Sequence, residues 1–194
     1  MTDTGFLLGD AFAARLPRNV RVQIQSGDCV ALYAGTHAIP IYAPTFHTPP
    51  DADCYALRAL PQAQLFGMAN LGTYTLPEYP GESFRLGLSG EMHISLAHLS
   101  GLRPLLMRMP GERSSLRALL DDPFLSRQMR SAVTDAILQT FGLNWDYPRI
   151  QAGRTALTQA CLQALFPILY ANGLLLQPHR FAIRRVSPPV LAER

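Results

Sequence analysis

The spacing of apolar residues changes once along this chain of 194 residues, and that change restricts the folds available to it. In the first half, apolar and polar residues alternate, which is typical of strands with one buried face. In the second half, apolar residues recur every three or four positions, which is typical of helices packed on one side. A strand-like pattern returns near the end. This order predicts an α+β domain in which helices cover one face of a mostly antiparallel sheet from the N-terminal half, with a returning C-terminal strand.

The segment 84–96 is the clearest of the predicted strands. Its apolar residues alternate with polar ones throughout, and we expect a bend at Gly87 or Gly90, because glycine in a strand often marks a bulge. Shorter strands are predicted over residues 20–25, 29–33, 38–42, 54–60 and 64–68.

The first 17 residues differ from this pattern. Leu8, Phe12 and Leu16 recur every four residues, so the segment 5–16 predicts a short amphipathic helix. The apolar content of 48% is enough for a substantial core. We therefore expect an N-terminal segment of residues 1–17, a single domain of residues 18–190 and a tail of residues 191–194.

The helical half ends in the most specific pattern of the chain. Asp122-Pro123 predicts the start of a helix over 123–141, because aspartate caps helices and proline suits the first helical position. A second long periodic segment, 150–170, ends at Asn172-Gly173, where glycine can adopt the left-handed conformation that closes a helix. The segment 174–186 then reads as a strand. Shorter helices are predicted over residues 97–109 and 114–120.

The composition argues against several functional classes. All 17 basic residues are arginine and are spread along the chain, so the net charge of +3 does not mark a nucleic-acid surface. Without lysine the chain cannot contain a Gly-Lys phosphate loop. The three cysteines lack metal-site spacing, and no apolar run approaches the roughly 18 residues of a membrane-spanning helix. We expect a cytoplasmic protein, able to attach peripherally to the inner membrane, with no metal and no cofactor.

Ser89, Glu91 and His93 are the first candidates for catalysis, and their spacing argues against it. Successive members lie roughly 6 to 7 Å apart along a strand, which is too far for an ordered relay without unusual bending. Cys54 follows an acidic pair, which would raise rather than lower the pKa of its thiol. A small hydrolase using Ser89 and His93, or Cys54, is the least favoured hypothesis, and we expect no catalytic residue.

Five residues are candidates for contact with a partner. Arg180, Arg184 and Arg185 would form a basic edge on the last strand, suited to anionic lipid, RNA or an acidic neighbouring subunit. The alternative is an exposed edge strand that its charges protect from pairing. Trp145, between the two long helices, and Phe12, in the N-terminal segment, are candidate apolar contacts.

Four segments together suggest a known family. They are the Gly-led turn and strand over 27–35, the motif Phe66-Gly67-Met68, the long strand 84–96, and the helix end Gly173-Leu174 followed by Phe181-Ala182-Ile183. In this order they resemble the SPFH (Band 7) domain of stomatin, prohibitin and flotillin relatives, in particular its bacterial virion-core-like branch. The resemblance covers most of residues 18–190.

The resemblance implies a non-enzymatic scaffold that associates side by side with copies of itself, often at a membrane surface. Our leading expectation is therefore a homo-oligomeric scaffold near a membrane or in a phage-like assembly, with a protein client as a further partner. The alternative is an arginine-dependent module for anionic lipid or nucleic acid, of which nucleic acid is the less favoured partner.

Overall fold

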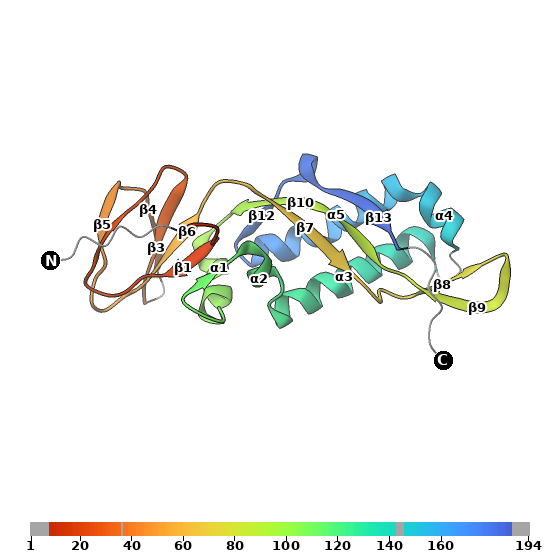
Figure 1. Cartoon of the computed structure of the whole chain (residues 1–194), viewed down its shortest axis with the longest axis horizontal. Coiled ribbons are helices and arrows are strands. Elements are labelled where there is room, and N and C mark those ends of the chain that lie inside the picture. Colours follow the sequence, from red (N-terminus) through yellow and green to blue (C-terminus); the bar gives the residue numbers. More distant parts are fainter. Residues whose placement is uncertain (1–7, 36, 143–145, 188–194) are drawn as a thin grey trace. The chain divides into compact units, whose positions relative to one another are not determined.

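The computed structural model describes residues 8–35, 37–142 and 146–187. It shows a mixed α+β structure with mostly antiparallel sheets, which confirms the predicted fold class (Figure 1). The chain divides into two compact units. Unit 1 contains Met1–Gln62, Ser95–Pro123 and Tyr170–Leu175, and unit 2 contains Ala63–Ile94, Phe124–Leu169 and Leu176–Arg194. Because each unit draws on three separate stretches, the division follows no single boundary, and the single domain over 18–190 stays a prediction.

The main sheet of unit 1 has five antiparallel strands in the order β11-β1-β6-β3-β4, beside a small β2-β5 pair. Alternating residues of these strands fill a buried apolar cluster, as the sequence pattern predicts. The strands are β1 (Ala13–Arg15), β2 (Arg21–Gln23), β3 (Asp28–Ala34), β4 (His37–Ile41), β5 (Thr45–His47), β6 (Asp53–Arg58) and β11 (Arg113–Ser114).

The helix predicted over 5–16 is wrong for the part of it that the structure describes. Ala13–Arg15 form β1, which pairs with β6 on one side and β11 on the other. The backbone amide of Phe12 also donates to the carbonyl of Ser114, at 2.9 Å. The three apolar residues at four-residue spacing are nevertheless all buried. A strand with its flanking residues therefore satisfies the same spacing as a helix, and the pairing of both edges of β1 decides for the strand.

Helix α1 (Leu99–Met107) begins with an unusual cap. The Nδ1 atom of His98 accepts a hydrogen bond from the backbone N–H of Gly101, at 3.1 Å. The same ring donates from Nε2 to the carbonyl of Tyr170 in helix α5 (Arg154–Ala171), at 2.8 Å. One imidazole therefore satisfies an orphan amide of one helix and a terminal carbonyl of another, both within unit 1.

We expect His98→Ala to lower the free energy of unfolding by about 1 to 2 kcal/mol, because it removes both hydrogen bonds. His98→Asn should be less damaging, since asparagine can cap α1 but is too short to reach Tyr170 as well. Urea denaturation followed by circular dichroism measures both variants. An alanine variant as stable as the wild type would contradict this role.

Gly173 closes α5 as the sequence predicts, with a φ of +77°. Its backbone also lies directly against the start of α1, where a Cβ atom would come within 2.5 Å of the carbonyl oxygen of His98. Glycine is therefore required at this position for two independent reasons, its dihedral angle and the close approach of another backbone.

The second large sheet is built on β10 (Leu88–Leu96), which pairs with β13 (Ala182–Val186), β12 (Leu174–Leu176) and β7 (Gln62–Met68). In unit 2, α3 (Pro123–Phe141) and α5 lie on one face of these strands (Figure 1). The α3 stripe predicted from the sequence is buried at every position: Leu125, Met129, Val133, Ile137 and Phe141. The remaining elements are β8 (Thr73–Leu76), β9 (Tyr79–Arg85), α2 (Leu116–Leu120) and α4 (Tyr147–Ala152).

The final strand predicted over 174–186 is interrupted. A short 3-10 turn, η1 (Pro178–Arg180), separates β12 from β13, because Pro178 has no amide hydrogen to donate to a neighbouring strand. Within β13, Arg185 lies opposite Ser89 and Ile183 lies opposite Gly90, so Arg184 is an extra residue in a bulge. The register of the two strands therefore shifts at the Ser89/Gly90 step, and the bend expected in the long strand stays a prediction.

Candidate interaction surface

The side of the β10 sheet that faces away from α3 and α5 carries its polar residues. Every second residue of β10 from Leu88 to Ile94 is buried, whereas Ser89, Glu91 and His93 between them are half-buried. We call this second side the outward face. The alternation that the sequence predicts is confirmed here.

Strand β7 contributes small and apolar residues to the outward face. Its Phe66 ring stacks on Phe181, with centroids 5.6 Å apart, and lies close to Gly90 on the buried side. The neighbours of Phe66 in the strand point the other way. Ala63, Leu65 and Gly67 are accordingly the exposed members of β7.

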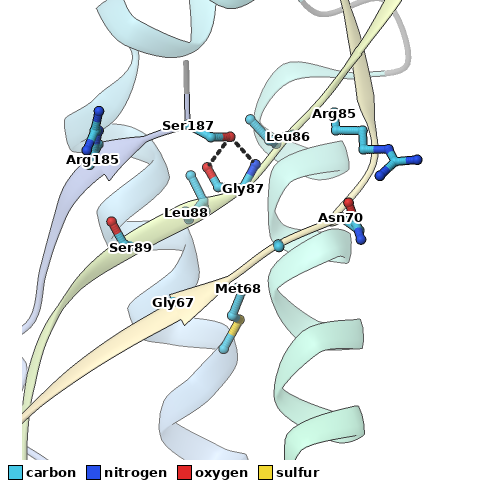
Figure 2. Close-up of a pocket in the computed structure, with 11 residues that line it drawn as sticks. Gly67, Met68, Asn70, Arg85, Leu86, Gly87, Leu88, Ser89, Arg185 and Ser187 are labelled. Atoms are coloured by element: carbon cyan, nitrogen blue, oxygen red, sulfur yellow. Dashed lines mark hydrogen bonds between the residues drawn. The ribbon is translucent and has the colours of Figure 1, made fainter. Parts of the chain in front are cut away.

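A hollow of about 620 Å³ lies where β7 ends and β10 begins (Figure 2). Its lining comes from β7 and the following loop (Gly67, Met68, Ala69, Asn70), from the start of β10 and the residues before it (Arg85, Leu86, Gly87, Leu88, Ser89) and from β13 and its exit (Arg185, Ser187). All of these residues belong to unit 2.

Two hydrogen bonds between Gly87 and Ser187 hold the backbone together beside the hollow. The Gly87 amide donates to Ser187 Oγ at 2.6 Å, and the Gly87 carbonyl accepts from the Ser187 amide at 2.8 Å. A Cβ atom at position 87 would lie 3.1 Å from the carbonyl oxygen of Met68, so only glycine fits without displacing a neighbour. Figure 2 shows Arg85 and Arg185 on opposite sides of Gly87. The lining of the hollow thus combines glycine and apolar residues with two arginines and two serine hydroxyl groups.

A second hollow of about 330 Å³ lies further along β10 and β13 and is more strongly charged. Its lining includes His93, His179, Arg180 and Arg184, with Glu91 as their counter-charge. Glu91 contacts His93 Nε2 at 3.1 Å and accepts a hydrogen bond from Arg184 at 3.2 Å. These two contacts hold the pKa of Glu91 below its usual value, first through His93 and then through Arg184.

The structure brings together two members of the supposed triad, but not in a catalytic order. Glu91 lies between Ser89 and His93 on the strand and binds His93. Ser89 has no side-chain hydrogen bond to any residue that the structure describes. A nucleophile needs direct contact with its base, and here a carboxylate separates them. The arrangement suits a charged recognition surface better than acyl transfer.

The thiols are poorly suited to nucleophilic chemistry. Burial, with a smaller contribution from Asp53, raises the pKa of Cys54 to about 11, so almost no thiolate exists at neutral pH. Cys161 lies among the buried residues of α5. In the ranges 8–35, 37–142 and 146–187, no three histidine, cysteine or acidic side chains meet as metal ligands would. None of the helices in these ranges has both the length and the apolar character needed to cross a membrane.

The residues predicted to contact a partner fall into three groups. Arg180 in η1 and Arg184 and Arg185 in β13 are all exposed, and the bulge explains why two consecutive strand residues are both turned outward. Phe12 is completely buried, so its prediction as a surface contact is wrong: its backbone bonds to Ser114 and Arg58 within the sheet of unit 1 instead of forming a surface helix. Trp145 lies outside the described residues.

Charge is distributed unequally between the two units. Unit 1 contains eight arginines and eight acidic residues, whereas unit 2 contains nine arginines and six acidic residues, so the net charge of +3 belongs to unit 2. Arg184 is neutralised in part by Glu91. Arg180 and Arg185 make no side-chain hydrogen bond or ion pair with other residues in the described part of the chain.

The outer edge of β7 is a candidate functional feature that the sequence did not reveal. Strand β7 pairs with β10 on one side, and the sheet ends there among the strands described. The segment 62–68 contains neither a charged residue nor proline, and Leu65 at its centre is 68% exposed. Short uncharged segments also occur inside cores, so the composition alone does not distinguish an edge strand from a central one.

Comparisons with models of known protein families and with curated proteins give no match. The class of molecule that the fold and the surface define is an α+β protein with a polar, arginine-bearing sheet face and, at β7, a seven-residue sheet edge without charge or proline.

Proposed function

We propose that this protein is a non-catalytic scaffold domain that associates with copies of itself. The observation that carries the proposal is the unprotected edge of β7. Edge strands of monomeric proteins are usually protected by charge, proline, a bulge or shortness, because an open edge pairs with other chains. Strand β7 has seven residues and none of the first two protections.

Other edge strands in the described part of the chain differ from β7, and the uncharged β8 and β12 have only four and three residues. Strand β4 contains Pro40, β9 contains Pro80 and Glu82, β13 contains two arginines, and β11 has only two residues. The contrast supports β7 as the edge kept open for association. An SPFH-like identity and a cytoplasmic location with a protein client are parts of the same proposal, supported by the order of elements from strands to helices to a returning strand.

Size-exclusion chromatography with light scattering, over a concentration series from about 1 to 500 μM, tests the proposal. We expect the molar mass to rise above the monomer value of 21.4 kDa as concentration increases. A mass that stays at the monomer value throughout would contradict it.

A second candidate function is binding to an anionic lipid surface through unit 2. The net charge of this unit and the exposed Arg180, Arg184 and Arg185 favour it. Leu65, exposed on the outward face, adds an apolar group of the kind that enters a lipid interface.

For this second function we expect replacement of all three arginines by glutamine to weaken binding to phosphatidylglycerol vesicles by about 100-fold, at about 1 kcal/mol per arginine. The matched control replaces three exposed arginines of unit 1, Arg18, Arg21 and Arg113, with the same change in net charge. Vesicle co-sedimentation at several salt concentrations measures both variants. Equal losses in the two variants would show a non-specific charge effect, and retention on single-stranded RNA alone would favour nucleic acid instead.

A further inference from the structure

We infer that two copies of this chain pair their β7 strands antiparallel, with Leu65 of one copy opposite Leu65 of the other. The inference rests on the proposed function, because it names the surface and the register through which copies associate. It converts two separate sheets into one continuous sheet related by a two-fold axis.

The backbone of β7 shows which of its groups are free to pair. Phe66 lies on the same face of the sheet as Gly90 of β10, as directly opposite residues do, and we take Phe66 and Gln64 as the residues that pair with β10. The side-chain amide of Gln64 donates to the carbonyl of Leu65 at 2.7 Å, which agrees with a Leu65 carbonyl on the other edge. The N–H and C=O of one strand residue point to the same side, and successive residues alternate. The backbone N–H and C=O groups of Ala63, Leu65 and Gly67 therefore lie along the outer edge of β7. Those of Gln64 and Phe66 face β10.

These outward groups determine the register. Antiparallel strands exchange hydrogen bonds only between residues that both point into the shared edge. Placing Leu65 opposite its own copy also places Ala63 opposite Gly67 on both sides, which pairs all three outward residues and forms about six hydrogen bonds. A shift by two residues in one direction would bring in Pro61, which has no amide hydrogen. A shift by two residues in the other direction would bring in Ala69, whose carbonyl already accepts a hydrogen bond from Arg130. The centred register is therefore favoured.

A second copy of β7 suits this edge better than an unrelated strand. The pairing brings no like charges together, because the strand has none, and it buries the exposed Leu65 side chain against its symmetry mate. Ala63 and Gly67 are small, so they leave room on the outward face for the two leucines. Only the Gln64 hydrogen bond to Leu65 has to be released.

The symmetry has a consequence for the rest of unit 2. A two-fold axis perpendicular to the joined sheet keeps the outward faces of both copies on the same side. Arg185 and the hollow beside Gly87 would then be present twice on one continuous surface. An anionic partner could contact both copies at once, and such a bivalent contact strengthens weak binding.

Disulfide trapping tests the register. Leu65→Cys should form a disulfide-linked dimer within minutes under mild oxidation, since directly opposite residues have Cα atoms about 5.5 Å apart. Ala63→Cys is the matched control, because residue 63 of one copy lies four positions, or about 13 Å, from residue 63 of the other. The native cysteines 29, 54 and 161 are buried and should not interfere. Ala63→Cys linking as fast as Leu65→Cys would overturn the register.

A charge substitution tests the interface without a covalent crosslink. Leu65→Lys places two ammonium groups opposite each other, and we expect at least about a tenfold rise in the dimer dissociation constant by sedimentation equilibrium. Phe124→Lys, at a similarly exposed residue of α3, makes the same charge change elsewhere in unit 2 and should leave the constant unchanged. Circular dichroism checks that both variants fold. If Leu65→Lys does not fold, disulfide trapping alone decides whether copies pair through β7.

The outcomes separate this inference from the proposed function. A wild type that associates, but shows neither a Leu65→Cys crosslink nor an effect of Leu65→Lys, would overturn the β7 interface and leave the scaffold function standing. Equal weakening by Phe124→Lys and Leu65→Lys would also overturn it. A wild type that is monomeric at every concentration and forms no crosslink would overturn both.

Discussion

Gly173→Ala should be among the most destabilising single substitutions in this protein, lowering the free energy of unfolding by about 3 kcal/mol or more. Two costs add at this position. The φ of +77° lies in the left-handed region, where a Cβ atom is unfavourable. That Cβ would also collide with the backbone of α1, at the carbonyl oxygen of His98 and the amide of Leu102. Backbone atoms in a helix cannot move aside cheaply, so the second cost is not relieved.

Gly142→Ala is the matched control for this substitution. Gly142 follows α3 as Gly173 follows α5, and its φ of +75° is almost the same. Among the described residues other than its chain neighbours, no atom lies within 4 Å of the position that its Cβ would occupy. It should therefore show only the dihedral cost, about 1 kcal/mol. Urea denaturation of both variants gives the comparison, and equal losses would show that the contact with α1 contributes nothing.

Gly90→Ala is the second substitution for which we expect a loss of about 3 kcal/mol, with separation of β13 from β10. The added Cβ would overlap the carbonyl oxygen of Ala182 and come within 2.9 Å of the Phe66 ring. Gly90 lies at the register shift between β10 and β13, so the carbonyl is held by the bulge. The stacked pair of Phe66 and Phe181 cannot retreat without exposing both rings.

Gly67→Ala serves as the control for a strand glycine with open space around it. It lies in the adjacent strand β7, and nothing would meet its Cβ within 4 Å. We expect a change of less than about 1 kcal/mol, in the stabilising direction, because alanine loses less conformational entropy on folding. Tryptophan fluorescence and circular dichroism, followed together during denaturation, measure both variants. A Gly90 variant as stable as the Gly67 variant would show that the bulge can adapt.

Much of the fold could be predicted because local pattern and tertiary environment agree. The long strand, the α3 stripe and the glycine stop at Gly173 all follow from spacing and from the chemistry of single residues. The segment 5–16 could not be predicted correctly, since its spacing fits a helix but β1 is held by strands on both sides. Strands distant in the sequence, which pair with β1, decide between a helix and a strand for this segment.

The candidate surface was only partly predictable, for the same reason. The exposure of Arg180, Arg184 and Arg185 follows from their charge, but their shared direction depends on a bulge opposite Ser89. The hollow beside Gly87 depends on Ser187, which is one hundred residues away in the sequence. The free edge of β7 depends on which strand lies last in the sheet, and alternation within one strand carries no information about its neighbours.

Amide hydrogen exchange along β7, followed by NMR at low and high protein concentration, tests the central claim most directly. In the pairing inferred above, the amides of Gln64 and Phe66 face β10, so both should be protected at both concentrations. They provide an internal standard for the exchange rates of the other amides. The amides of Ala63, Leu65 and Gly67 should exchange quickly in dilute solution and become protected as copies pair. Exchange at these three positions that stays fast at every concentration would contradict association through this edge.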